Sequence, residues 1–259
     1  MKKLTKLTAL ALALVMVLGL LAGCGSSNAD SSTDNSGEDT AKDKLVVATS
    51  PDFPPFESLE GGEVVGIEVD ILKLIAEKLG MELDIQQMDF DSVIPGVQAG
   101  KFDVGMSGIT VTDKRKENVD FSSVYFMAAQ AIVVSADSGI TGKADLEGKK
   151  VSVQTGTTAE DYCMANGYEV LAFTANNDAA ALTGGKVDAW VVDNEVALAM
   201  APDLGLTVLD EAMTAEPYAF AFQKGSELVA PFNEALDALL ADGTVEKIFS
   251  DYGVTYVGP

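Results

Sequence analysis

The segments KLVVAT at residues 44–49, DILKLIAEKLG at residues 70–80 and ELDIQQM at residues 82–88 decide the fold of this chain. The first is a short β-branched run that a proline-rich turn at residues 51–55 brings to an end. In the second, apolar residues recur at helical spacing and Gly80 provides the stop. The third alternates like a strand. Strand, helix and strand in succession predict a parallel sheet with covering helices.

The same alternation continues along the chain. A helix capped by Asp91 and a strand at residues 103–106 complete a first βαβαβ unit. After Ala131 the pattern restarts, with predicted strands and helices in turn at residues 150–154, 157–166, 168–173, 178–183 and 187–192. The chain then predicts a strand at residues 219–222 and amphipathic helices at residues 226–241 and 244–252. Two α/β units without a proline-rich linker between them predict two lobes joined by crossing strands.

Residues 1–23 have the layout of a secretory signal peptide. Lys2, Lys3 and Lys6 form a basic stub, and an almost unbroken apolar run follows from residue 7. An uncleaved signal anchor is the alternative, because the run is near the lower length limit for a membrane span.

The apolar run closes with LAGC, in which the cysteine is Cys24, and this resembles the lipobox of bacterial lipoproteins. The resemblance implies that Cys24 is acylated and becomes the first residue after cleavage, which would give the two chains that stable anchoring needs. Residues 25–43 contain no large apolar side chain, so residues 24–43 are expected to be the lipidated cysteine and a disordered tether.

The composition excludes several classes of function. A formal net charge of −23 argues against nucleic acid or anionic lipid as a partner. The chain contains no histidine, which removes Ser-His-Asp and Cys-His nucleophiles and most zinc sites. We therefore expect no metal and no cofactor. If Cys24 carries lipid, Cys163 has no disulfide partner, and its place in a predicted helix indicates a small buried side chain.

The segment GMSGITVTDKR at residues 105–115, continued by ENVDFS at residues 117–122, resembles the signature of the polar amino-acid-binding proteins of ABC importers, extracellular solute-binding proteins of the family 3 type. Further blocks match that family in the right order, at residues 49–57, 66–80, 153–162 and 188–197. The resemblance covers nearly all of residues 44–259.

The resemblance implies an α/β fold of the periplasmic-binding-protein type, with two lobes, two hinge crossings and a ligand cleft between the lobes. The crossings are expected near residues 124–129 and 215–219. Lobe 1 would be discontinuous, with residues 44–127 and 219–259, and lobe 2 would comprise residues 128–218.

The implied function is that of the substrate-binding component of an ABC amino-acid importer, which captures a free L-amino acid by hinge closure. The expected partners are the amino acid and the permease and ATPase subunits. The protein would be an extracytoplasmic monomer that contacts the membrane through its lipid anchor only. Two alternatives share this fold: an enzyme like cyclohexadienyl dehydratase, and an amino-acid sensing module. The absence of histidine favours binding over catalysis.

A free amino acid is a zwitterion, so burial requires a partner for each charge. Arg115 is the candidate for the α-carboxylate, because a guanidinium matches a carboxylate bidentately. Thr110, the N–H of Gly108 and Thr158 in the first turn of a helix would add donors. By its residue type alone Arg115 would be a solvated surface arginine, but the family pattern T-x-x-R places it in the site.

Asp193 is the candidate for the ammonium, because it follows a buried strand and a buried carboxylate needs a partner. The alternative is an N-cap for the next helix. The resemblance adds the hydroxyl of Ser107 and the carbonyl of Gly108 as acceptors.

For the ligand side chain, Phe53 and Phe90 occupy positions where family members place aromatic walls, although each alone would be read as core. Ser50 stands where several relatives with basic ligands carry an acid, and Gln154 and Val192 would line the distal pocket. Glu68 could partly replace that missing charge, but its usual role would be that of a solvated residue where a turn leads into a helix. We take Phe56, Phe121 and Trp190 as packing residues. These features predict a neutral polar ligand such as glutamine or cystine.

Overall fold

The computed structural model describes residues 43–175 and 177–259. The predictions for the signal peptide, for Cys24 and for the tether up to residue 42 lie outside the described residues. Among the helices of the described part, none has both the length and the apolar character that crossing a membrane requires.

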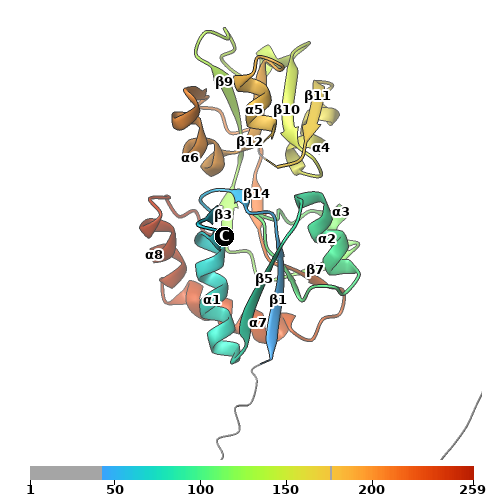
Figure 1. The fold of residues 1–259 in the computed structure, drawn as a ribbon, viewed down its shortest axis with the longest axis vertical. Helices are drawn as coiled ribbons and strands as arrows, with labels where there is room; N and C mark the ends of the chain where they lie inside the picture. Colours follow the sequence, from blue (N-terminus) through green and yellow to red (C-terminus); the bar gives the residue numbers. More distant parts are fainter. Residues whose placement is uncertain (1–42, 176) are drawn as a thin grey trace, which may run out of the picture. The chain divides into compact units, whose positions relative to one another are not determined.

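The first sheet has the strand order β5-β1-β6-β15-β7. Figure 1 labels its strands β1, β5 and β7. Its strands are β1 Lys44–Thr49, β5 Glu82–Gln87, β6 Val104–Gly105, β7 Val119–Phe121 and β15 Ala221–Gln223. Strand β1 pairs in parallel with β5 and β6, as the βαβαβ pattern predicts. Strand β15 is antiparallel to β6 and β7, so the sheet as a whole is mixed. The reason is that β15 comes from a distant part of the chain and enters in the opposite direction.

Five helices accompany this sheet in sequence: α1 Ile67–Leu79, α2 Phe90–Gln98, α3 Asp113–Lys116, α7 Val229–Ala241 and α8 Thr244–Asp251. A small antiparallel sheet precedes α1, with strands β2 Asp52–Phe53, β3 Glu57–Glu60 and β4 Glu63–Val65. The predicted cap of α2 is wrong, because Asp89 and not Asp91 occupies the N-cap position.

Helix α1 begins three residues earlier than the sequence predicts and buries its apolar face against α7 and α8. It starts directly after Gly66, whose φ is +140°. A Cβ atom at Gly66 would lie 2.2 Å from the carbonyl oxygen of Phe56. Only glycine allows the backbone to approach so closely at this φ.

The second sheet has the order β11-β10-β12-β9-β13. Its strands are β9 Gln130–Ser135, β10 Lys150–Gln154, β11 Glu169–Phe173, β12 Ala189–Asp193 and β13 Leu206–Val208. The helices of this region are a 3-10 helix at Lys143–Leu146, α4 Thr158–Ala165, α5 Asn177–Thr183 and α6 Asn194–Leu204. Strand β10 is parallel to β11 and β12, whereas β9 runs antiparallel to β12 and β13. This sheet too is therefore mixed.

Two short strands connect the sheets. Strand β8 Phe126–Ala128 leads into β9, and β14 Glu216–Tyr218 leads back to β15. The two strands pair with each other in antiparallel fashion. They fall on the residues predicted for the two crossings, and the predicted two-lobed α/β fold is confirmed.

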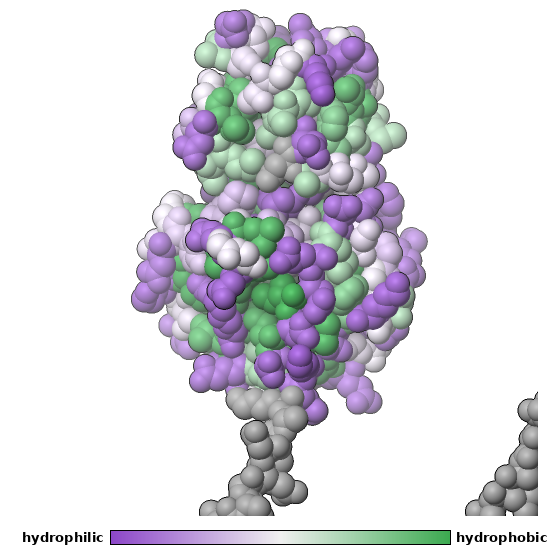
Figure 2. All heavy atoms as spheres, viewed as in Figure 1, coloured by the Kyte–Doolittle hydropathy of each residue, from purple (hydrophilic) through white to green (hydrophobic). Residues whose placement is uncertain are grey.

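Most of the residues predicted to pack do so. Phe56, Trp190 and Cys163 are buried, whereas Phe121 is half-buried and contacts the cluster around α2. Hydrophilic residues cover much of the visible face of the molecule (Figure 2), as expected for a strongly acidic chain.

Candidate functional site

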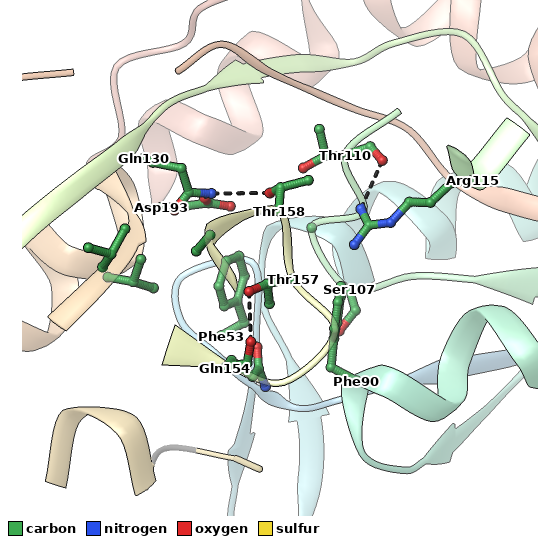
Figure 3. A pocket seen from close by; sticks show the side chains of 14 residues that line it. Phe53, Phe90, Ser107, Thr110, Arg115, Gln130, Gln154, Thr157, Thr158 and Asp193 are labelled. Atoms are coloured by element: carbon green, nitrogen blue, oxygen red, sulfur yellow. Dashed lines mark hydrogen bonds between the residues drawn. The ribbon is translucent and has the colours of Figure 1, made fainter. Parts of the chain in front are cut away.

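A cavity is lined by residues from both five-stranded sheets and from the segments that connect their strands; its atom-free space of about 360 Å³ includes open solvent. Its lining consists of Phe53, Phe90, Ser107, Gly108, Thr110, Arg115, Gln130, Gln154, Thr157, Thr158, Ala159, Val191, Val192 and Asp193 (Figure 3). All of the residues predicted to bind ligand are among them except Ser50. The structure thus gathers side chains that are far apart in the sequence into one hollow.

Arg115 lies on α3, which Thr112 caps by accepting a hydrogen bond from the Arg115 N–H at 3.1 Å. The guanidinium donates from Nη1 to the carbonyl oxygen of Thr110 at 2.9 Å and from Nη2 to that of Gly156 at 3.1 Å. It also lies over the ring of Phe90, 5.5 Å from the centroid. Arg115 is therefore a wall of the cavity and not a solvated surface arginine.

Burial lowers the pKa of Arg115 from its ordinary value, and the nearby charges of Glu216 and Asp193 oppose that shift. An arginine stays protonated under these conditions. The cavity thus has a permanent positive charge in one wall.

Asp193 is the last residue of β12 and is 6% exposed. Its two carboxylate oxygens accept hydrogen bonds from Gln130 Nε2 and from the hydroxyl of Tyr218. Although it occupies the N-cap position of α6, its side chain makes no capping hydrogen bond. The alternative role of a helix cap is therefore wrong.

Burial raises the pKa of Asp193 to about 7, and the charge of Glu216 adds to the shift. The hydrogen bonds from Tyr218 and Gln130 and the charge of Arg115 act in the opposite direction. Near neutral pH, the ionisation of Asp193 therefore depends on the charges and hydrogen bonds of the residues around it.

Two buried glutamates lie behind Ser107 and Gly108. The Ser107 hydroxyl donates to Glu57 Oε1 at 3.0 Å, and the Gly108 N–H donates to Glu68 Oε2 at 3.0 Å. The hydroxyl of Tyr125 donates to the other oxygen of Glu68. Two expectations are corrected here: Glu68 is fully buried and not solvated, and the N–H of Gly108 is occupied and does not point to a ligand.

Burial raises the pKa of Glu57 well above its ordinary value, and the charge of Glu68 and a hydrogen bond with it add to this. Within the described residues, Glu57 Oε2 is buried without a hydrogen-bond partner. Two carboxyl groups in one dry site cannot both be ionised at low cost, and the raised pKa of Glu57 favours its protonated form.

Gly108 has a φ of +52°, and a Cβ atom there would lie 2.6 Å from the ring of Phe53. The backbone turn that presents the Gly108 carbonyl therefore packs directly against an aromatic wall of the cavity. A larger residue at position 108 would push that wall aside.

At the far end of the cavity, Gln154 Nε2 donates to Asp52 Oδ2 at 2.9 Å. The hydroxyl of Ser50 donates to Asp52 Oδ1 at 2.8 Å. Ser50 thus lies behind Asp52 and outside the lining, and the acid absent at position 50 is present two residues later. Burial raises the pKa of Asp52.

Four lining residues were missed from the sequence: Gln130, Thr157, Ala159 and Val191. Thr157 caps α4, accepting from the Glu160 N–H at 3.2 Å, which places Thr158 in the first turn. Gln130 is a single polar residue at the start of an apolar strand, a signal that could have identified it. Val191 carries no such signal.

Two contacts join α3 to the region of α4. The exposed Lys114 Nζ lies 3.1 Å from Asp161 Oδ2, and Arg115 donates to the Gly156 carbonyl as described above. Within the described residues, no group of three or more histidine, cysteine or acidic side chains could hold a metal ion.

A family model of bacterial extracellular solute-binding proteins, family 3, matches residues 45–255. The chain belongs to this family. The arginine-binding extracellular protein ArtP of Bacillus subtilis (strain 168) is 37% identical over 237 residues, which are 88% of this chain and 90% of ArtP. The glutamine-binding protein GlnH of the same organism is 32% identical over 264 residues, which are 95% of this chain and 97% of GlnH.

Solved structures show the same fold. An ancestral arginine-binding protein bound to glutamine has a TM-score of 0.77 at 42% identity, over 82% of this chain and 98% of that chain. The same kind of protein bound to arginine gives 0.76 at 42% identity, over 82% and 99%. The ancestral amino-acid-binding protein AncCDT-1, a precursor of cyclohexadienyl dehydratase, gives 0.76 at 35% identity, over 81% and 95%. This family 3 protein is accordingly an extracytoplasmic, amino-acid-binding solute-binding protein.

Proposed function

We propose that the protein captures one free L-amino acid in this cavity by hinge closure and delivers it to the permease and ATPase subunits of an ABC importer. The observation that carries the proposal is the pairing of Arg115 and Asp193 in the lining of one cavity. A zwitterion needs a cation and an anion a few ångströms apart, and both side chains are held in place by hydrogen bonds.

In this proposal Arg115 binds the α-carboxylate, and the hydroxyls of Thr110 and Thr158 add donors. Asp193 binds the ammonium together with the Gly108 carbonyl and Ser107. Phe53 and Phe90 enclose the side chain, and Gln154 contacts its end. The proposed lobes are residues 44–127 with 219–259, and residues 128–218, which agrees with the membership of the two five-stranded sheets.

The identity of the ligand depends on its side chain. The absence of an acid at position 50 predicts a neutral polar ligand, but Asp52 accepts a hydrogen bond from Gln154, which lines the cavity. The α-carboxylate and α-ammonium of the ligand would pair with Arg115 and Asp193, and Asp52 would then have no positively charged partner in the cavity. A positively charged side chain would supply it, and the faces of two phenylalanines suit a planar guanidinium. We therefore propose a basic ligand of the arginine type, in agreement with the named ligand of ArtP.

The test is a thermal-shift screen of residues 44–259 against the common amino acids and cystine, followed by calorimetry. A ligand at about a hundred times its dissociation constant should stabilise the fold by roughly 2.7 kcal/mol. Stabilisation by arginine supports the basic ligand, whereas stabilisation by glutamine or cystine alone supports the neutral one. No stabilisation by any amino acid would refute the proposed function.

Binding and not catalysis is part of the proposal, as is a monomeric state. Conversion of arogenate or prephenate to phenylalanine or phenylpyruvate by the purified protein would favour the dehydratase alternative instead. This assay is justified because the similar protein AncCDT-1 is described as a precursor of cyclohexadienyl dehydratase. A sensing role would require a partner other than an importer, and import assays in cells lacking the protein separate the two.

We also propose that residues 1–23 are a signal peptide and that Cys24 is the lipid anchor. Cys24→Ala should release the protein from the membrane and leave its affinity unchanged. Cys163→Ala is the matched control, because Cys163 is buried within α4. Retention of Cys24→Ala on the membrane would contradict the anchor.

A further inference from the structure

Gln130 begins β9 and is 1% exposed, yet it lines the cavity. Its Nε2 donates to Asp193 Oδ1 and to Thr158 Oγ1, the latter at 3.3 Å. Figure 3 shows the amide of Gln130 directed toward Thr158, with Asp193 beside it. Its Oε1 is buried and has no hydrogen-bond partner in residues 43–175 and 177–259.

The nitrogen and the oxygen of the Gln130 amide differ in their hydrogen bonding. The nitrogen is fully used, because it touches one carboxylate and one hydroxyl. The oxygen is an acceptor without a donor, and a buried polar atom without a partner is unfavourable. A group that enters the cavity with N–H donors would satisfy it.

The α-ammonium of an amino acid carries three N–H donors. Each oxygen of Asp193 already accepts one hydrogen bond, from Gln130 or from Tyr218. Asp193 can therefore accept further bonds from the ammonium but does not saturate it. The amide oxygen of Gln130, next to that carboxylate, is a suitable additional acceptor.

We propose that Gln130 is a positioning and ligand-binding residue: its N–H group orients the carboxylate of Asp193, and its carbonyl oxygen accepts a hydrogen bond from the ligand ammonium. The inference rests on the proposed function, because it assigns the ammonium to this end of the cavity.

The charged and titratable groups around Asp193 determine how a substitution of Gln130 changes the pKa of Asp193. Arg115 from α3 and the hydroxyl of Tyr218 favour the ionised form, and Glu216 disfavours it. The phenol of Tyr125 is a further titratable group whose ionisation the charge of Asp193 opposes. Burial raises the pKa of Asp193, and the hydrogen bond from Gln130 lowers it; with the other neighbours the result is a pKa of about 7. Removal of that hydrogen bond should raise the pKa further.

The experiment compares wild type, Gln130→Met, Gln130→Glu and the control Gln87→Met. Methionine keeps the length and removes both polar ends. Glutamate keeps the shape, but when ionised it has no donor and adds a like charge beside Asp193. Gln87 is exposed on β5 and makes no contact with the cavity lining. Affinities for L-arginine, L-glutamine and L-cystine are measured by calorimetry between pH 5.5 and 8.5.

We expect wild-type affinity to rise with pH around neutrality. For Gln130→Met, the midpoint of that rise should move up by about one pH unit, and affinity at pH 6 should fall by at least about tenfold. The same upward shift is expected for Gln130→Glu, which serves if the methionine variant does not fold. Gln87→Met should match wild type.

A loss of affinity equal at every pH would overturn the role of Gln130 in positioning Asp193, because the lost hydrogen bond to the ligand would then explain the whole effect. An affinity that is unchanged at every pH would overturn both parts of the inference. If the wild-type protein binds none of the three amino acids, the proposed function itself fails and the inference falls with it. Binding by wild type with unaltered profiles in both variants refutes the inference alone.

Discussion

Replacing Arg115 by alanine tests the central charge of the cavity. Among the described lining residues, Arg115 is the one with a positive charge. Its two hydrogen bonds, of 2.9 and 3.1 Å, go to backbone carbonyls and fix the guanidinium without neutralising it. A ligand carboxylate buried beside the alanine would have no counter-charge.

The magnitude follows from that loss. Removing one partner of a buried ion pair costs about 3–5 kcal/mol. At about 1.4 kcal/mol per factor of ten, the dissociation constant should rise by roughly 140-fold to 3,700-fold. The buried carbonyl of Thr110, left without its donor, should lower the free energy of unfolding by an amount on the order of 1–3 kcal/mol, whereas water can replace the donor at the exposed Gly156.

The assay is calorimetry with the amino acid that the screen identifies, at pH 8, where Asp193 is mostly ionised. Lys116→Ala is the matched control, because Lys116 is on the same helix but is exposed and forms a surface ion pair with Asp113 at 3.5 Å. Arg115→Lys keeps the charge without the bidentate fork and should fall between wild type and alanine. A change below about threefold in Arg115→Ala, or an equal loss in Lys116→Ala, would refute the reasoning.

Three further predictions concern the buried acids and one glycine. Burial raises the pKa of Asp193 to about 7, above an unfolded value near 4, so the ligand-free protein should lose stability as pH rises from about 4 to 7. Asp193→Asn should flatten that part of the stability curve and weaken ligand binding at pH 8 by about 3–5 kcal/mol, and urea unfolding with calorimetry would show it. The pKa of Glu57 is also raised, so Glu57→Gln should increase the free energy of unfolding at neutral pH; a loss of stability there would mean that Glu57 is ionised and paired. Gly66→Ala should destabilise the fold by about 2–5 kcal/mol, because its φ is +140° and the new Cβ atom would lie 2.2 Å from the Phe56 carbonyl oxygen. Gly62→Ala should cost only about 1–2 kcal/mol, because its φ is +94° and no atom lies within 4 Å of the new Cβ atom. Equal melting temperatures for the two glycine variants would contradict this.

The fold was largely predictable because its signals are local. Apolar periodicity identified α1, α7 and α8, and β-branched runs identified β1, β10 and β12. The short strand β14 was less evident, since three residues with a central proline carry little pattern. The mixed character of both sheets was missed because strand direction depends on where the chain returns, which no local window contains.

The candidate site was predictable to the extent that family motifs carry it. Arg115 and Asp193 were identified through the motif and the strand end, and both line the cavity. Glu68 was misjudged because an acid at a helix start usually faces water. Asp52 was overlooked because its role depends on Gln154, 102 residues away.

The sequence alone determined which segments form strands and helices, which glycines and prolines end them, and which family the chain resembles. These properties arise from backbone preferences and side-chain spacing within a few residues. Only the tertiary structure decided that Asp193 bonds to Gln130 and Tyr218, 63 and 25 residues away, and that Glu57 and Glu68 share a dry interior. Those outcomes depend on sheet order and on the two crossings, because a hydrogen bond forms wherever folding brings donor and acceptor together.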